Sequence, residues 1–209
     1  MTSFLGTTAA GGYANTGHKL VFSSTFADEQ ADEDTPPRPL SAEFMAFVTS
    51  FSQAFASSWT SEAVYGRIDP IGTFQGNQRT ISVGWDVPAG SPKEAAASSL
   101  QFATLSQLLY PSYTGGDTAA MGNALTLAKP PLIKLKYANL ISTVNGDPLL
   151  GWINNVSWTP ALDMGMFQAG DKLYPKVVSL QIDFSVLHEG EMGWEDGAWK
   201  GGATFPFGG

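Results

Sequence analysis

The stretch Val178-Ser179-Leu180-Gln181-Ile182-Asp183-Phe184-Ser185-Val186 alternates apolar and polar side chains without a break. Successive side chains of a β-strand point to opposite faces of the sheet, so a period of two separates the apolar set from the polar set. Residues 177–187 therefore predict a strand that is buried on one face and faces water on the other.

Three further segments show the same period. Residues 79–87 alternate Ile81, Val83, Trp85 and Val87 with polar or small residues, and 133–137 alternate apolar side chains with two lysines. A third strand is expected over 151–158. Residues 41–59 are ambiguous, because their phenylalanines fit one face of a helix as well as one side of a strand; we favour the strand.

One helix is expected over about 91–109. Ser91-Pro92-Lys93-Glu94 is a capping box with proline at the first helical position. Phe102, Leu105 and Leu109 then form an apolar stripe along one side. Pro111 ends the helix.

Length and composition fit this pattern. The 209 residues suit a single domain, with 43% hydrophobic, 12% aromatic and only 14% charged residues, and with 23 glycines for turns. The fold class expected is β-dominated (α+β), with antiparallel sheets and one flanking helix. Residues 41–209 would form this domain. Residues 1–40, with an acidic run at 28–34 followed by three prolines, would form a flexible arm in which Leu20-Val21-Phe22 could be a short strand.

The same numbers exclude several classes of function. A net charge of −8 without a Lys/Arg cluster argues against gripping nucleic acid by its phosphates. With no cysteine and with two histidines, His18 and His188, lacking further ligands, we expect no metal and no cofactor. No acid lies on an apolar strand face, so catalysis has no positive support. No secretory signal or membrane-spanning run is found.

Several segments, in this order, resemble the baseplate tail-tube initiators of contractile-tailed phages. They are Trp59-Thr-Ser-Glu-Ala-Val-Tyr65-Gly66-Arg67-Ile68-Asp69-Pro70-Ile71, Arg79-Thr-Ile-Ser-Val83, Lys129-Pro130-Pro131-Leu132, Val186-Leu187-His188-Glu189 and Phe205-Pro206-Phe207-Gly208. The resemblance runs from about residue 40 to the end of the chain. It implies a tail-tube-like fold of packed β-sheets with a flanking helix, six copies of which form a ring around a channel.

The resemblance further implies a non-enzymatic virion protein of the tail baseplate, made in the host cytoplasm. Its partners would be further copies of itself and the hub, wedge and tail-tube proteins, with DNA only as passing cargo and no membrane. The candidate subunit contacts are Trp59, Arg67, Asp69, Arg79 and Trp194. The candidate channel-lining residues, for which an ordinary outer surface is almost equally expected, are Thr80, Ser82, Asp86, Gln181, Asp183 and Ser185.

Alternatives stay open at this point. Arg67 and Asp69, beside Gly66 and Pro70, could form an ion pair within a turn instead of a subunit contact. Trp194 and Trp199 could bind glycan, which would make the chain a cell-wall binding module. A tail-associated hydrolase would need a pair of acids brought together by the fold.

Overall fold

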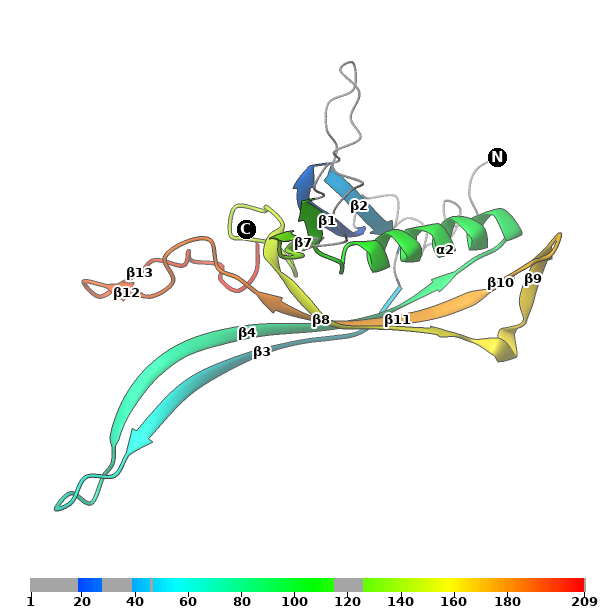
Figure 1. Ribbon diagram of the computed structural model, residues 1–209. Helices are drawn as coiled ribbons and strands as arrows, with labels where there is room; N and C mark the ends of the chain where they lie inside the picture. Colours follow the sequence, from blue (N-terminus) through cyan, green and yellow to red (C-terminus); the bar gives the residue numbers. More distant parts are fainter. Residues whose placement is uncertain (1–18, 28–38, 46, 115–125, 209) are drawn as a thin grey trace, which may run out of the picture.

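The computed structural model of the chain describes residues 19–27, 39–45, 47–114 and 126–208 (Figure 1). Strands dominate this part of the chain. They are β1 (Leu20–Ala27), β2 (Pro39–Phe44), β3 (Phe47–Glu62), β4 (Ile71–Pro88), β5 (Ser112–Thr114), β6 (Thr126–Lys129), β7 (Ile133–Tyr137), β8 (Leu149–Pro160), β9 (Met166–Ala169), β10 (Lys172–Pro175), β11 (Val177–Val186), β12 (Trp194–Glu195) and β13 (Ala198–Trp199). The described helices are α2 (Pro92–Gln107) and the 3-10 turn η2 (Leu162–Met164).

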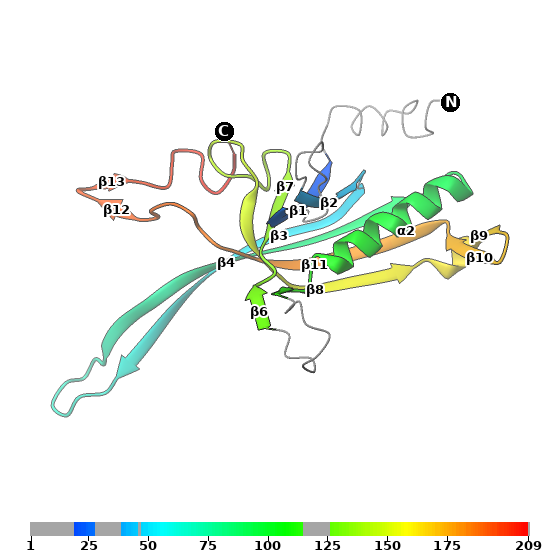
Figure 2. The ribbon, with the colours of Figure 1, turned by 45° about the horizontal axis from the view of Figure 1, so that its top comes forward.

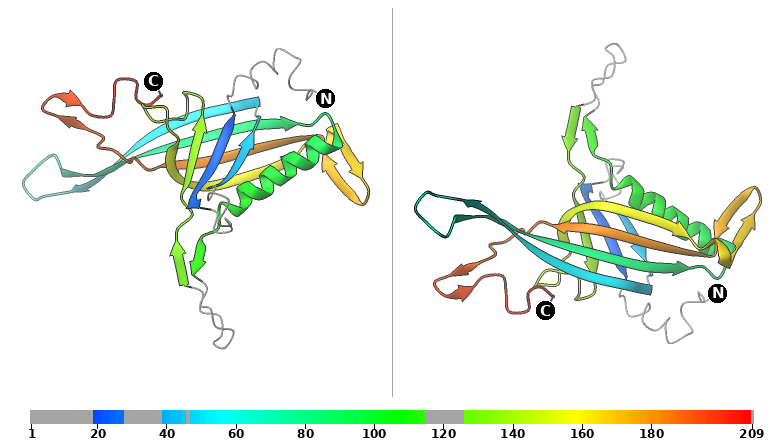
Figure 3. Two further views of the ribbon diagram at one scale, coloured as in Figure 1. Left: turned by 90° about the horizontal axis from the view of Figure 1, so that it is seen from above. Right: turned by 90° about the horizontal axis from the view of Figure 1, so that it is seen from below.

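Seven strands form one sheet in the order β2-β1-β7-β8-β11-β4-β3, and every neighbouring pair is antiparallel. The sheet turns at β8, whose first residues pair with β7 and whose remainder pairs with β11. The short strands β1, β2 and β7 therefore lie over the long strands and cross them, as Figure 3 shows from above. The expected β-dominated class with antiparallel sheets and one flanking helix is confirmed.

The expected strands are present, and the described residues of 41–59 fall mainly in β2 and β3, as favoured. Strand β11 pairs with β4 so that Leu180 lies opposite Trp85 and Asp183 lies opposite Ser82. Equal periods on both strands thus join into one apolar face and one polar face.

The core lies between the two halves of the folded sheet. Trp85 is fully buried, and its ring contacts Phe22 at 6.0 Å and Phe44 at 5.6 Å between centroids. The burial of Leu20 and Phe22 shows that β1, the described strand of the expected 1–40 arm, packs into this core. The acidic run at 28–34 lies outside the described residues.

Helix α2 lies over the apolar face (Figures 1 and 2). Ser91 caps it by accepting a hydrogen bond from the Glu94 backbone N–H at 3.3 Å. The Glu94 carboxylate reaches back to the Gly90 N–H at 2.9 Å, one residue before the expected partner. The stripe is also present, because Leu105 is fully buried and Phe102 stacks on Trp158 at 5.6 Å.

Candidate assembly surfaces

The long strands end in two open sheet edges. Strand β3 is the last strand of the sheet, and no described strand pairs with its outer side. Strand β8 pairs with β7 only as far as Gly151, so among the described residues 152–160 have a free edge as well. Unpaired N–H and C=O groups along an edge are a template for pairing with another chain.

Side chains match between the two edges, face by face. On the helix side, β3 carries Phe51 and Phe55, and β8 carries Ile153 and Val156. On the opposite side, polar or small residues predominate on both edges, with Phe47 on β3 and Trp152 on β8 as the exceptions. The polar or small set is Ser50, Ser52 and Ala54 on β3 and Asn155, Ser157 and Thr159 on β8. An even register between the two edges would therefore continue both faces of the sheet.

All six candidate channel-lining residues lie on the polar face of β4 and β11. Hydrogen bonds link the two strands there, from Ser82 to Asp183 at 2.5 Å and from Ser179 to Asp86 at 2.6 Å. Where β3, β4, β11 and β8 run together, Asp86 and Asp183 are the charged side chains of this face, and no lysine or arginine lies on it.

Ser185 differs from the expectation for a lining residue, because it is fully buried. Its hydroxyl accepts hydrogen bonds from the Asn154 amide at 2.7 Å and from the Gln78 amide at 3.3 Å. The extra residue Asn154 is a β-bulge in β8, and it brings the amide over the hydroxyl.

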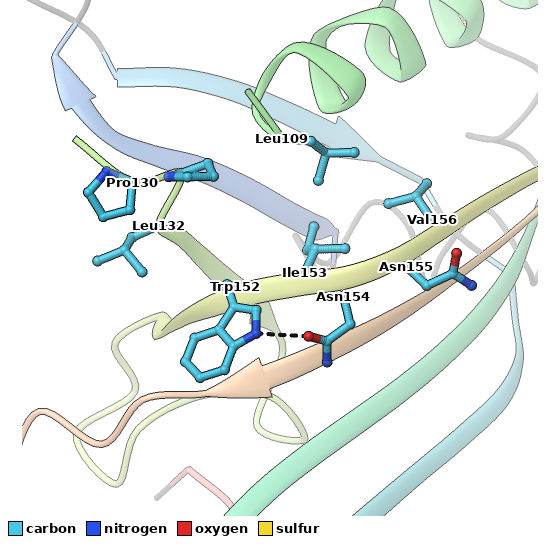
Figure 4. A pocket seen from close by; sticks show the side chains of 9 residues that line it. Leu109, Pro130, Leu132, Trp152, Ile153, Asn154, Asn155 and Val156 are labelled. Atoms are coloured by element: carbon cyan, nitrogen blue, oxygen red, sulfur yellow. Dashed lines mark hydrogen bonds between the residues drawn. The ribbon is translucent and has the colours of Figure 1, made fainter. Parts of the chain in front are cut away.

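An apolar groove runs beside the free edge of β8 (Figure 4). Its volume is about 480 Å³. The rim is fixed by a hydrogen bond of 2.8 Å from the Trp152 indole N–H to the Asn154 side-chain oxygen. The lining residues are Leu109, Pro130, Pro131, Leu132, Trp152, Ile153, Asn154, Asn155 and Val156.

The outer part of the β3–β4 hairpin projects beyond the sheet as a two-stranded ribbon, visible in Figures 1 and 3. Strand β11 pairs with β4 only from Arg79 onward, so in residues 56–62 and 71–78 the described strand pairing is between β3 and β4 alone. Trp59 is 63% exposed and packs edge-to-face on Phe74 at 5.2 Å. Because an isolated two-stranded hairpin is marginal in water, the ribbon is a surface suited to a partner.

The turn of this hairpin does not hold the expected ion pair. Arg67 and Asp69 are both exposed, and neither belongs to an ion pair among the described residues. Tyr65 and Ile68 in the same turn are fully exposed. The subunit-contact alternative for Arg67 and Asp69 stays a prediction.

Arg79 is buried within the protomer, only 2% exposed, so its guanidinium is not on an accessible surface as a subunit contact requires. It donates to the Gln53 side-chain oxygen at 3.0 and 3.2 Å and to the Pro206 carbonyl at 2.9 Å. It also lies over the rings of Phe55 and Phe205, at 5.8 and 5.5 Å. Arg79 thereby holds the C-terminal segment, residues 187–208, against the base of the hairpin.

Burial lowers the pKa of Arg79 to about 10. The pKa of His188 is lowered as well, first by partial desolvation, although the residue stays exposed, and then by the charge of Arg79. The His188 ring lies 6.2 Å from that of Phe205, so this histidine takes part in holding the C-terminal segment.

Trp194 is 74% exposed at the far end of this segment, in the ribbon of β12 and β13. Its ring meets that of Trp199 at 5.6 Å and at an angle of 55°, so the two rings do not form one flat platform. Trp199 is tied down by its own hydrogen bond to the Gly202 carbonyl at 2.9 Å. Trp194 alone offers a free aromatic face.

Within the described ranges, no group of three or more His, Asp or Glu side chains could hold a metal ion. No helix in the described part of the chain is long and apolar enough to cross a membrane.

No protein-family model matches the chain, and no curated protein matches it. Among solved structures, it is similar to a chain of the "Cryo-EM structure of the anti-feeding prophage (AFP) baseplate, 6-fold symmetrised". The identity is 10%, covering 82% of this chain and 90% of that chain, with a TM-score of 0.27.

Some features of these surfaces were not predicted from the sequence. The groove joins residues from α2's end, β8 and the segment before β7, which only the fold brings together. The pair Pro130-Pro131 could have indicated the free edge of β8. Neither proline has a backbone N–H to donate, so strand pairing is expected to end beside them. The use of Arg79 within the protomer had no such signal.

Proposed function

We propose that this chain is a non-enzymatic structural subunit of a contractile phage-tail baseplate. Copies of it form a ring around a channel, six in number as the sequence resemblance to tail-tube initiators implies. The observation that carries the proposal is the pair of open edges, on β3 and β8, whose two faces match.

Strand direction supports closure of such a ring. The strands β8, β11, β4 and β3 alternate in direction, so β3 runs opposite to β8. A second copy placed by rotation presents its β8 edge to the first copy's β3 edge, and the alternation continues. Head-to-tail contacts of this kind close into rings when the rotation closes, and closure removes both exposed edges.

The polar face would line the channel, because α2 and the crossing strands cover the other face (Figure 2). With Asp86 and Asp183 as its charged residues and no lysine or arginine on it where the four strands run together, this face would repel DNA phosphates. Six copies, each at −8, carry about −48. DNA would pass through as cargo without being bound.

The partners and location follow from this role. The ring would join the central hub to the tail tube and initiate tube assembly, next to hub, wedge and tube proteins. The protein would be made in the host cytoplasm and end in the virion. The turn of the hairpin, residues 63–70, and Trp194 are the surfaces we assign to contacts beyond the ring, and the acidic run at 28–34 is left without an assigned role.

Disulfide trapping tests the edge pairing. The chain has no cysteine, so every cross-link must come from the introduced residues. Asn155 would be changed to Cys together with Ser52, Ala54, Ala56 or Ser58, all exposed on the polar face. Directly opposed antiparallel residues have Cα atoms about 4.5–5.5 Å apart, which a disulfide spans. We expect one pair to give a ladder of covalent oligomers on oxidation, whereas pairs with Gln53, on the other face, give none. Monomers from every pair would contradict the proposal.

A cell-wall binding module is the second candidate, favoured by the free aromatic face of Trp194. Its test is co-sedimentation with peptidoglycan. Binding that Trp194→Ala abolishes, by a chain that stays monomeric, would select this candidate.

A further inference from the structure

The apolar groove lies where the free edge of β8 begins. Strand β7 pairs with β8 up to Ile133 opposite Gly151, and the residues before it, Pro130 to Leu132, turn away from the sheet. The groove opens between these residues and the helix-side residues Ile153 and Val156 (Figure 4). An edge strand added to β8 would therefore run into the groove at this end.

The other open edge carries an aromatic side chain on the matching face. Trp59 is four residues beyond Phe55 along β3 and so points to the helix side, as Ile153 and Val156 do. Most of its ring is uncovered, with Phe74 and Gly72 of the adjacent strand beneath it. Trp59 is thus an exposed aromatic side chain on one edge, and the groove beside the other edge is a hollow that no described side chain fills.

The stagger between strands brings Trp59 of one copy close to the groove of the next. Within the protomer, Gly151 shares a row with Val186, Arg79 and Phe55. Closed barrels are staggered by about one residue per strand, so a four-stranded unit shifts its neighbour by about four residues. An even shift keeps both faces continuous. If the shift is toward the tip of the hairpin, where β3 overhangs, Ser57 comes beside Ile153. Trp59 is then level with Gly151, whose edge Ile133 already occupies, so it meets the end of β7 where the groove opens.

We propose that Trp59 of one copy inserts into the groove of a second copy, between the Pro130–Leu132 segment and Ile153, and sets the register of the ring. The Trp59 contact rests on the edge pairing proposed above, and it names the residue that would fix the register of that pairing. A fixed register matters because Ala56, Ser57 and Ser58, the part of β3 next to Trp59, are small or polar on both faces and specify pairing weakly. A buried aromatic anchor in a pocket is the usual dominant contact of an interface.

The test compares Trp59→Ala with Tyr65→Ala, a matched loss of an exposed aromatic at the tip of the same hairpin. The readouts are the concentration at half-assembly from sedimentation and the pattern of disulfide trapping between Asn155→Cys and each β3 cysteine. We expect Trp59→Ala to raise the half-assembly concentration about tenfold or more. It should also spread the trapping from Ala56 to its neighbours Ala54 and Ser58. Tyr65→Ala should change neither readout.

A variant that fills the groove gives an independent test. Leu132→Trp would occupy the groove from within its own chain, so it should weaken assembly as Trp59→Ala does, with thermal unfolding checking that each variant folds. If Trp59→Ala assembles at the wild-type concentration with the same trapping pattern, the Trp59 anchor is wrong while edge pairing stands. If the wild-type register gives no trapped oligomer at all, both proposals fail.

Discussion

Replacing Arg79 tests whether one buried cation holds the C-terminal segment on the hairpin. Arg79→Met keeps most of the apolar stem but removes the guanidinium, which donates to Gln53 and Pro206 and lies over two rings. Leaving the two acceptors unpaired costs about 1–3 kcal/mol each, and losing two ring contacts costs roughly 0.5–1 kcal/mol each.

Relief of desolvation offsets part of this cost. Burial lowers the pKa of Arg79 to about 10, so keeping the charge inside the fold costs a few kcal/mol. The net expectation is a loss of about 2 kcal/mol in the free energy of unfolding. Denaturant unfolding measures this quantity, and limited proteolysis should show earlier cleavage within residues 187–208.

The control is Arg67→Met, an exposed arginine outside any ion pair of the described residues, which should leave stability within about 0.5 kcal/mol. Arg79→Met that is as stable as wild type, with the C-terminal segment equally resistant to protease, would refute the reasoning.

The same contact predicts a pH dependence. Partial desolvation and the Arg79 charge lower the pKa of His188 in the folded state, so the unfolded chain takes up this proton first as the pH falls below about 6.5. Stability should therefore decline through this range and level off below the folded-state pKa. Comparing unfolding midpoints at pH 7.5 and 5 should give a smaller decline for His188→Gln than for wild type. An equal decline in both proteins would assign the pH dependence to other groups.

Three further changes have definite expectations. Gly151→Ala should destabilise the fold by about 1–3 kcal/mol in thermal unfolding, since a Cβ there would fall on the Ser185 carbonyl oxygen and the Phe184 ring; wild-type stability would show that β8 can shift. Ser91→Ala should cost about 1 kcal/mol by loss of the α2 cap, measured the same way, and no change would mean that Glu94 alone suffices. Asp86→Lys with Asp183→Lys should make the assembled ring bind duplex DNA in a salt-dependent manner by fluorescence anisotropy, with the two Asn substitutions as the control; no binding would place this face outside the channel.

The regular elements could be predicted because their signals are local. The alternation in β4 and β11 and the capping box of α2 depend on neighbours within a few residues, and all three were predicted correctly. The choice of strand for 41–59 was decided by pairing with β1 and β4, which the phenylalanine spacing alone could not show.

The surfaces were harder to predict because they depend on contacts between distant residues. Arg79 reaches Pro206 across 127 positions, and nothing near Arg79 in the sequence marks that partner. Ser185 was assigned to the polar face correctly by its period, but its burial depends on the bulge at Asn154. A period shows which face a side chain is on and leaves open what covers it.

The most direct test of the central claim is cryo-electron microscopy of the assembled chain. The account predicts a closed ring in which β3 of each copy lies beside β8 of the next, with Asp86 and Asp183 facing the channel and α2 outside. A monomer, or a ring in which α2 faces the channel and both sheet edges stay open, would contradict it.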